Sequence, residues 1–138
     1  MSTESGSPQS GSGVAFRIPR VLCVSEEVAL LAELREAFER VNCRVECAPG
    51  VAEAHAITRL VSCDLVIAEW RLEGRPGLDW VALIAPEPVL LVLSEEEDTV
   101  IVLPPNARGM FRKPFDTNQL VSFAASLLRA RDLDVALE

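Results

Sequence analysis

Hydrophobic and polar positions along the chain alternate between two spacings. Short, almost continuously apolar runs predict strands that are buried on both faces. Stretches in which apolar residues recur three or four positions apart predict amphipathic helices. Strands are expected at Arg20–Val24, Arg44–Ala48, Asp64–Ala68, Val89–Leu93 and Met110–Arg112. Helices are expected over residues 26–41, 51–61, 78–85 and after Asp116.

Five such strands that alternate with helices indicate an α/β fold, in which a parallel sheet is covered on both sides. Crossover connections are right-handed, and the chain is short. The leading topology is therefore a flavodoxin-like, doubly wound, five-stranded parallel sheet of order 2-1-3-4-5. Ligands in this architecture bind beyond the carboxyl ends of the central strands, so the residues that follow each strand carry the functional information.

The segment between the fourth and fifth strands departs from this alternation. Residues 99–103 read Thr-Val-Ile-Val-Leu, which favours a strand, and the next two residues are prolines, through which no helix can continue. Further on, Asp116 is placed to cap the last helix, with Gln119 completing a capping box. That helix should direct toward the core Leu120, Phe123, Ala124, Leu127 and Leu128.

The 138 residues suit one domain. Residues 1–15 form a leader rich in Ser and Gly, which cannot bury enough apolar surface to fold and is expected to be disordered. Residues 16–132 form the domain, and residues 133–138 form a tail or linker.

The net charge of the chain limits the kinds of molecule that it can bind. The chain has 13 Lys and Arg against 21 Asp and Glu, a net charge of −8, which repels phosphate backbones and disfavours direct binding of nucleic acid. No apolar run approaches the roughly 20 residues that a membrane span needs. The N-terminus also lacks the basic-then-apolar order of a secretion signal. We therefore expect a cytoplasmic protein without membrane contact.

The four cysteines and the single histidine are not expected to bind a metal, form a disulfide or take part in catalysis. The four cysteines lack zinc-type spacing, and in an extended strand Cys43 and Cys47 would lie about 13 Å apart. A disulfide tolerates a separation of no more than about 7 Å between Cα atoms. We therefore expect reduced thiols in the core, and we interpret His55 as a packing or surface residue.

Polar side chains follow the predicted strands. Ser25, Glu26 and Glu27 come after the first strand, and Glu69 ends the third. The fourth and fifth strands are followed by a hydroxyl and an ammonium group, those of Ser94 and Lys113. Because the carboxyl ends of parallel strands meet at one edge of a sheet, these groups should converge there.

These residues resemble the receiver domain of two-component response regulators, over about residues 20–131. Val24–Glu27 takes the place of the acidic pair after the first strand. Asp64–Leu78 resembles the phosphoacceptor strand and its following loop, and Val92–Ser94 is similar to the strand that ends in a phosphate-binding hydroxyl. Gly109–Phe115 resembles the Lys-Pro signature of the family, the most specific of the four motifs.

The resemblance implies a particular chemistry. In the family an aspartate accepts a phosphoryl group, Mg²⁺ held by acidic neighbours neutralises its charge, and a lysine and a hydroxyl bind its oxygens. On this chain Glu69 is the phosphoacceptor equivalent, and Ser94 and Lys113 are the phosphate-binding equivalents. Phosphorylation in the family then shifts a two-state surface toward a partner or an output domain.

The sequence also departs from the family. Glu69 replaces the aspartate, and its additional methylene pushes the carboxylate outward; a misplacement of about 1 Å can cost ~100-fold in rate. Ser25 replaces the first acid of the metal-binding pair, which leaves Glu26 and Glu27. Met110 stands where the family places a switch aromatic. The segment before the fifth strand is about one helical turn short, so the fourth helix of the family should be shortened, distorted or replaced by extended chain.

We therefore expect a degenerate receiver, or pseudo-receiver, domain that is not an enzyme and does not turn over phosphate. No cofactor is expected, and Mg²⁺ is the one candidate. In this hypothesis Glu69 reaches Lys113 and Ser94 and imitates the phosphorylated arrangement. The domain would then signal through a protein partner or an attached output domain, with a homodimer as one form.

Three alternatives stay open. The first is a working phosphoacceptor receiver that controls an attached transcription domain, and the second is an enzyme or small-ligand site on the same sheet. The third is purely structural: Glu26 and Glu27 would be first-turn acids of a helix capped by Ser25, and Lys113 with Glu69 an ordinary ion pair. In that interpretation the acids at 95–98 form a solvated loop, and both tryptophans are packing residues.

Overall fold

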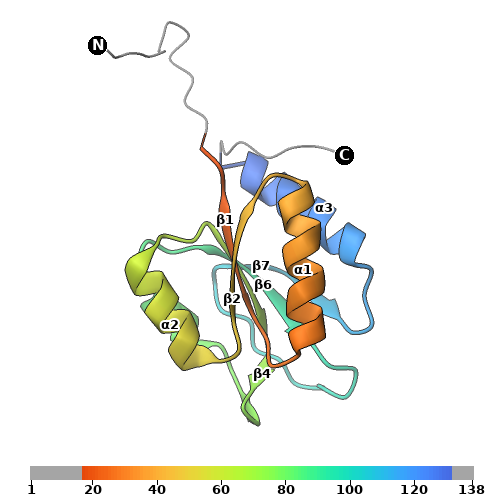
Figure 1. Ribbon diagram of the computed structural model, residues 1–138. Helices are drawn as coiled ribbons and strands as arrows, with labels where there is room; N and C mark the ends of the chain where they lie inside the picture. The colour runs from red at the N-terminus through yellow and green to blue at the C-terminus, as the bar shows by residue number, and fades with distance from the viewer. Residues whose placement is uncertain (1–16, 132–138) are drawn as a thin grey trace, which may run out of the picture.

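The computed structural model describes residues 17–131 (Figure 1). The predicted leader and the predicted tail lie outside the described residues. Within them, none of the helices is both long enough and apolar enough to cross a membrane.

A five-stranded parallel sheet forms the centre of the domain. Its strands lie in the order β2 (Arg44–Ala48), β1 (Arg20–Val24), β3 (Leu65–Glu69), β6 (Val89–Ser94) and β7 (Ala107–Arg112). All four neighbouring pairs are parallel. The flavodoxin-like, doubly wound topology of order 2-1-3-4-5 is therefore confirmed, with β6 and β7 as its fourth and fifth strands.

Helices cover both faces of this sheet. On one side lie α1 (Val28–Arg40) and α3 (Thr117–Arg129), and on the other lie α2 (Val51–Leu60) and a short 3₁₀ helix, η1 (Asp79–Leu83) (Figure 1). Successive strand residues alternate between two hydrophobic cores: Cys23 packs with α1 and α3, whereas Leu22 packs with α2 and η1. Because both faces of the three inner strands are buried, β1, β3 and β6 are almost entirely apolar, whereas edge strands β2 and β7 carry charged residues.

Two helix predictions need correction. The helix predicted over 78–85 is only the 3₁₀ helix η1, because Pro86 disfavours helical backbone at the residue before it and Ile84 is already extended. The first helix begins at Val28, with Glu27 as its N-cap, so Glu26 and Glu27 are not first-turn acids. The structural interpretation of that acidic pair, with Ser25 as the cap, is wrong.

The segment 95–106 contains neither a helix nor a strand. This confirms that the fourth helix of the family is not retained, because residues 95–106 form turns and irregular chain, and the strand predicted over 99–103 is wrong. β7 takes the position beside β6 that the segment would need to become the fifth strand of the sheet. Val100 and Val102 are 77% and 73% exposed, while Ile101 between them packs against the core that contains α2.

A small antiparallel hairpin follows β3 and was not predicted. It consists of β4 (Arg71–Leu72) and β5 (Arg75–Pro76). The two turn residues both have positive φ, 56° at Glu73 and 74° at Gly74, as a two-residue type I′ turn requires. The sequence indicated only a loop around Gly74.

Asp116 caps the last helix as predicted, but within the described residues the Gln119 side chain makes no return hydrogen bond, and the core face has one exception. The Asp116 carboxylate accepts hydrogen bonds from the backbone N–H groups of Asn118 and Gln119, at 2.8 and 3.2 Å. Leu120, Ala124 and Leu128 are buried as expected, but Phe123 is 37% exposed and stacks edge-on against Phe111, which lies on edge strand β7. All four cysteines are free thiols.

Candidate functional site

The candidate site lies beyond the carboxyl ends of the central strands. Glu69 is the last residue of β3 and is buried, at 5% exposure. Lys113 directly follows β7, and its backbone N–H donates to the carbonyl of Ser94 at the end of β6, at 2.9 Å. This hydrogen bond fixes the start of the Lys113 side chain beside β6, from where the flexible ammonium reaches across to β3.

Glu69 has two donors on one oxygen. Its Oε2 atom accepts hydrogen bonds from Ser25 Oγ at 2.8 Å and from Lys113 Nζ at 2.7 Å. Ser25 Oγ in turn accepts from the backbone N–H of Glu27 at 3.0 Å, which ties the loop after β1 to the same point. The carboxylate is thus held by one donor that follows β1 and one that follows β7.

Lys113 is shared by three carboxylates. Besides Glu69, its Nζ atom donates to Glu27 Oε2 at 2.5 Å and to Glu95 Oε2 at 2.8 Å. We call Glu27, Glu69, Glu95 and Lys113 the Lys113 cluster. With all four groups ionised it carries a net charge of −2, and Lys113 is the only lysine of the chain.

The surroundings shift both central pKa values. Burial raises the pKa of Glu69, and the hydrogen bonds from Lys113 and Ser25 offset this only in part. Burial by itself would lower the pKa of Lys113, but its hydrogen bonds to the three carboxylates prevail and raise that pKa above the usual lysine value. Lys113 is therefore a cation at neutral pH, and it provides the charge that allows three carboxylates to lie together.

The loop after β6 places Glu95 in the cluster. Asp98 is 4% exposed and accepts from the backbone N–H of Glu95 at 2.8 Å and from Arg71 at 3.4 Å. Arg112 donates from one nitrogen to the carbonyls of Glu95, Glu96 and Asp98, at 3.0, 3.0 and 2.9 Å. The interpretation of this acidic stretch as a solvated loop is therefore wrong for Glu95 and Asp98. In the sequence, the feature that could have indicated an ordered loop here is Arg112, which directly precedes the Lys-Pro motif.

Three residues singled out in the sequence take no part in the cluster. Ser94 Oγ is buried and has no hydrogen-bond partner among the described residues, so the expected contact from Glu69 to Ser94 is wrong. The Glu69 side chain extends instead toward Ser25 after β1, and β1 and β6 flank β3 on opposite sides. Glu26 is exposed, and Met110 is 38% exposed on edge strand β7.

The same carboxylates form a candidate site for Mg²⁺. Oxygens of Glu27, Glu69 and Glu95 all lie within 4.8 Å of one another, a spacing that a metal ion could bridge. However, Lys113 Nζ lies within 2.8 Å of an oxygen of each of these three carboxylates and already occupies the position between them. Ser25 stands where a further carboxylate would be needed. As arranged, the residues fit an ammonium group and not Mg²⁺, which requires a near-octahedral shell of oxygens.

Comparisons with known proteins agree with this architecture. The family model for the response regulator receiver domain matches residues 21–125. No curated protein matches the chain.

Solved structures extend the likeness to the whole fold. A response regulator receiver domain protein from Clostridium thermocellum superposes with a TM-score of 0.71 at 19% identity, covering 83% of this chain and 98% of that one. The signal receiver domain of an HD domain-containing protein from Pseudomonas fluorescens Pf-5 gives 0.74 at 20% identity, covering 84% and 98%. NtrX from Brucella abortus, in complex with ADP, gives 0.70 at 19% identity; the match covers 84% of this chain but only 28% of that longer protein.

Proposed function

The chain belongs to the response regulator receiver domain family, whose members are signalling modules of two-component systems, and from that premise we propose that it is a pseudo-receiver. In this proposal it takes no phosphoryl group, needs no Mg²⁺ and signals in one fixed state through protein contacts. The observation that carries the proposal is the Glu69 carboxylate, which stands at the acceptor position and is already held by Lys113 and Ser25.

Two features of this carboxylate support a loss of phosphoryl transfer. A nucleophile must approach phosphorus in line, and the longer side chain of Glu69 alters that approach. In addition, Oε2 accepts from two donors in a buried position, so attack through it would first require breaking both hydrogen bonds. The remaining carboxylates are paired with the same ammonium, which supports independence from Mg²⁺.

The pairing with Lys113 also supports a fixed signalling state. In the family, the lysine binds an oxygen of the phosphoryl group; here it binds a carboxylate oxygen that extends further from β3 than an aspartate would. Ser94 takes no part, so the imitation of the phosphorylated arrangement rests on Lys113. The net charge of −8 favours a protein partner or an attached output domain over nucleic acid, and we place this activity in the cytoplasm.

Incubation with acetyl phosphate and Mg²⁺ tests the absence of phosphoryl transfer. We expect no acid-stable, base-labile phosphoryl group on the wild-type chain by intact mass. The matched control is the double variant Ser25→Asp and Glu69→Asp, which restores the carboxylates that the family uses and should gain the group. Phosphorylation of the wild type that disappears in Glu69→Gln would contradict the proposal.

The fixed state has its own test. Glu69→Ala should shift backbone amide resonances in β7 and in residues 95–106, because it releases Lys113 from β3. The control is Glu73→Ala, which likewise removes one glutamate carboxylate, but an exposed one in the hairpin turn, and it should shift only its neighbours. If the Glu69→Ala spectrum changes only next to residue 69, the domain is not held in its state by this contact.

A second candidate function, a working phosphoacceptor receiver, is favoured by the clustering of three carboxylates within 4.8 Å. In that function acetyl phosphate would transfer its phosphoryl group to a Glu69 oxygen, forming an acyl phosphate and releasing acetate. Lys113 would then have to leave Glu27 and Glu95 so that Mg²⁺ could take its place. The acetyl phosphate experiment separates the two functions.

A further inference from the structure

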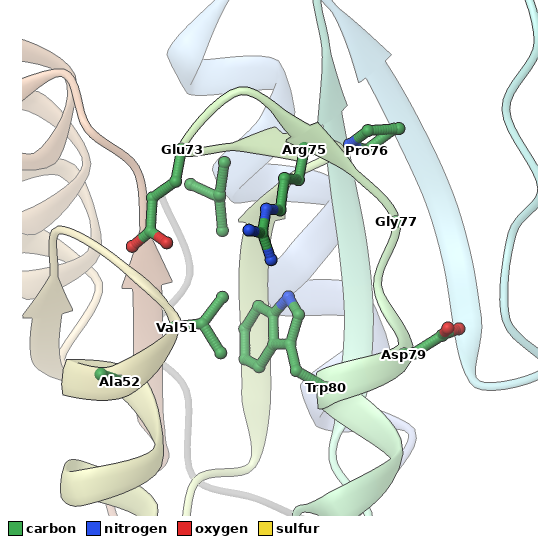
Figure 2. Close-up of a pocket in the computed structure, with 9 residues that line it drawn as sticks. Val51, Ala52, Glu73, Arg75, Pro76, Gly77, Asp79 and Trp80 are labelled. Atoms are coloured by element: carbon green, nitrogen blue, oxygen red, sulfur yellow. The ribbon is translucent and has the colours of Figure 1, made fainter.

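A cavity of about 460 Å³ lies beside the β4–β5 hairpin, and none of the residues that line it belongs to the Lys113 cluster. The first turn of α2, the hairpin and η1 enclose it (Figure 2). Val51, Leu72, Pro76 and Trp80 provide apolar walls, and Arg75 and Glu73 provide charge. Its volume is in the range of sites that bind small organic molecules.

The hairpin geometry directs Arg75 toward this cavity. Leu72 and Arg75 are cross-strand partners, so their side chains lie on the same face of the hairpin, and Leu72 is buried on that face. Arg71 belongs to the opposite face and pairs with Asp98. The tight two-residue turn and the Arg71 contact together fix the position of the hairpin over the cavity.

Two donors meet in the cavity without an acceptor. The indole Nε1 of Trp80 is buried and has no hydrogen-bond partner, and the Arg75 side chain makes no ion pair or hydrogen bond within residues 17–131. Figure 2 shows the guanidinium of Arg75 and the indole nitrogen of Trp80 directed toward each other. A buried N–H group without an acceptor is unfavourable and rare in folded proteins, which indicates that a missing group accepts from it.

The acidic groups near the cavity do not face the two donors. The Glu73 carboxylate turns toward α2, where it approaches Gly50, and Asp79 points away from the cavity (Figure 2). The indole itself is held in place, because His55 Nε2 lies 3.1 Å from the carbonyl of Trp80 and the two rings meet edge-on at 5.9 Å. An exposed guanidinium can rotate aside while the indole stays fixed, which opens a path to Nε1.

We propose that this cavity binds a small organic acid. Its carboxylate accepts hydrogen bonds from Trp80 Nε1 and Arg75, and its apolar part lies against Val51 and Leu72. A carboxylate suits this pair of donors because it offers two oxygens to one cation and one neutral N–H group. The site is independent of the Lys113 cluster and of the function proposed for it.

Phenylacetate is the probe, followed through the indole N–H resonances of the ¹⁵N-labelled full chain. Trp70 is the only other tryptophan, so its indole resonance is an internal reference, and Trp80→Phe assigns the two signals. We expect a saturable downfield shift of the Trp80 resonance with a Kd of about 1 mM, typical of a ligand this small. Phenylacetamide, which keeps the shape and loses the charge, should bind about fivefold more weakly.

Two arginine variants then distinguish a specific contact with Arg75 from a general effect of positive charge. Arg75→Gln should weaken phenylacetate binding about fivefold, whereas Arg59→Gln, which removes an exposed arginine from the far end of α2, should leave it unchanged. The proposal is overturned if phenylacetate causes no saturable shift of the Trp80 resonance. It is also overturned if acid and amide bind equally, or if both arginine variants have the same effect.

Discussion

Lys113 Nζ lies 2.7 Å from Glu69 Oε2, although their strands are not neighbours, because β6 lies between β3 and β7. The long lysine side chain spans that strand and joins the carboxyl end of β3 to the sheet edge. The same ammonium group also contacts the more exposed carboxylates of Glu27 and Glu95. The contact therefore links three loops, and its loss should affect stability as well as signalling.

Removal of the ammonium group leaves three carboxylates together. Lys113→Met should lower the free energy of unfolding by about 3 kcal/mol at neutral pH, because charges remain without their partner. The substitution should also create a binding site for a divalent cation. Urea denaturation with and without Mg²⁺ measures both effects. We expect Mg²⁺ to stabilise the variant and not the wild type; equal responses would show that the ammonium does not exclude the ion.

The protonation of Lys113 can be followed directly, because a single lysine gives a single side-chain signal. Its pKa is raised in the folded protein, so the stability it contributes is fully present below the usual lysine value of 10.5 and is lost as the pH rises through the folded value. The ¹³Cε shift of labelled lysine should titrate above that of the urea-unfolded chain. Glu69→Gln should move the midpoint downward, and an unchanged midpoint would exclude Glu69 as a cause.

Arg112 holds the loop that places Glu95. Arg112→Ala should remove three hydrogen bonds to backbone carbonyls, destabilise the domain by about 1–3 kcal/mol and increase amide hydrogen exchange in residues 95–98. The control is Arg108→Ala on the same strand, since Arg108 donates only to the nearby carbonyls of Pro105 and Ala107. Equal exchange in both variants would contradict this role.

Gly109 is required by the position of Phe123. A Cβ atom at residue 109 would lie 2.8 Å from Cε2 of Phe123 and 3.3 Å from Cδ2 of Leu91. Gly109→Ala should therefore cost about 1–3 kcal/mol by overpacking, measured by urea denaturation. The added substitution Phe123→Leu should recover part of this loss. If the double variant shows only the sum of the two single losses, the contact is not the cause.

Buried thiols should make the protein sensitive to alkali. Burial raises the pKa of Cys43 and of Cys63 from 9.0 to about 11, and it also raises the pKa of Cys23. Between these values the folded chain binds more protons than the unfolded one, so stability falls as the pH rises above 9, by roughly 1 kcal/mol per thiol at pH 10.

The chain has no tyrosine, which leaves this pH interval to the thiols. Urea denaturation under reducing conditions at pH 8 and pH 10 checks the expected loss. Cys63→Ala should show a smaller decrease than the wild type. An identical decrease in both would assign the effect to other groups.

Much of the architecture could be predicted from local patterns. The inner strands are apolar on both faces and the helices on one, so the spacing of apolar residues in the sequence reflects their burial. The sheet order is the one favoured by right-handed crossovers. Glu69, Ser94 and Lys113 could be assigned to one edge because each directly follows or ends a strand. These features depend on residues that are close in sequence.

The hydrogen-bond partners of those residues were decided only by the tertiary structure. Ser25 after β1 and Lys113 after β7 donate to the same oxygen of Glu69, and Ser94 does not. Glu95 joins the cluster because Asp98 and Arg112, on different segments, fix the loop between them. The segment 99–103 has the composition of a strand, yet β7 occupies the only available edge beside β6. The composition of a segment indicates which secondary structure it can form. Strand pairing and side-chain contacts depend on which other segments lie nearby in the folded chain.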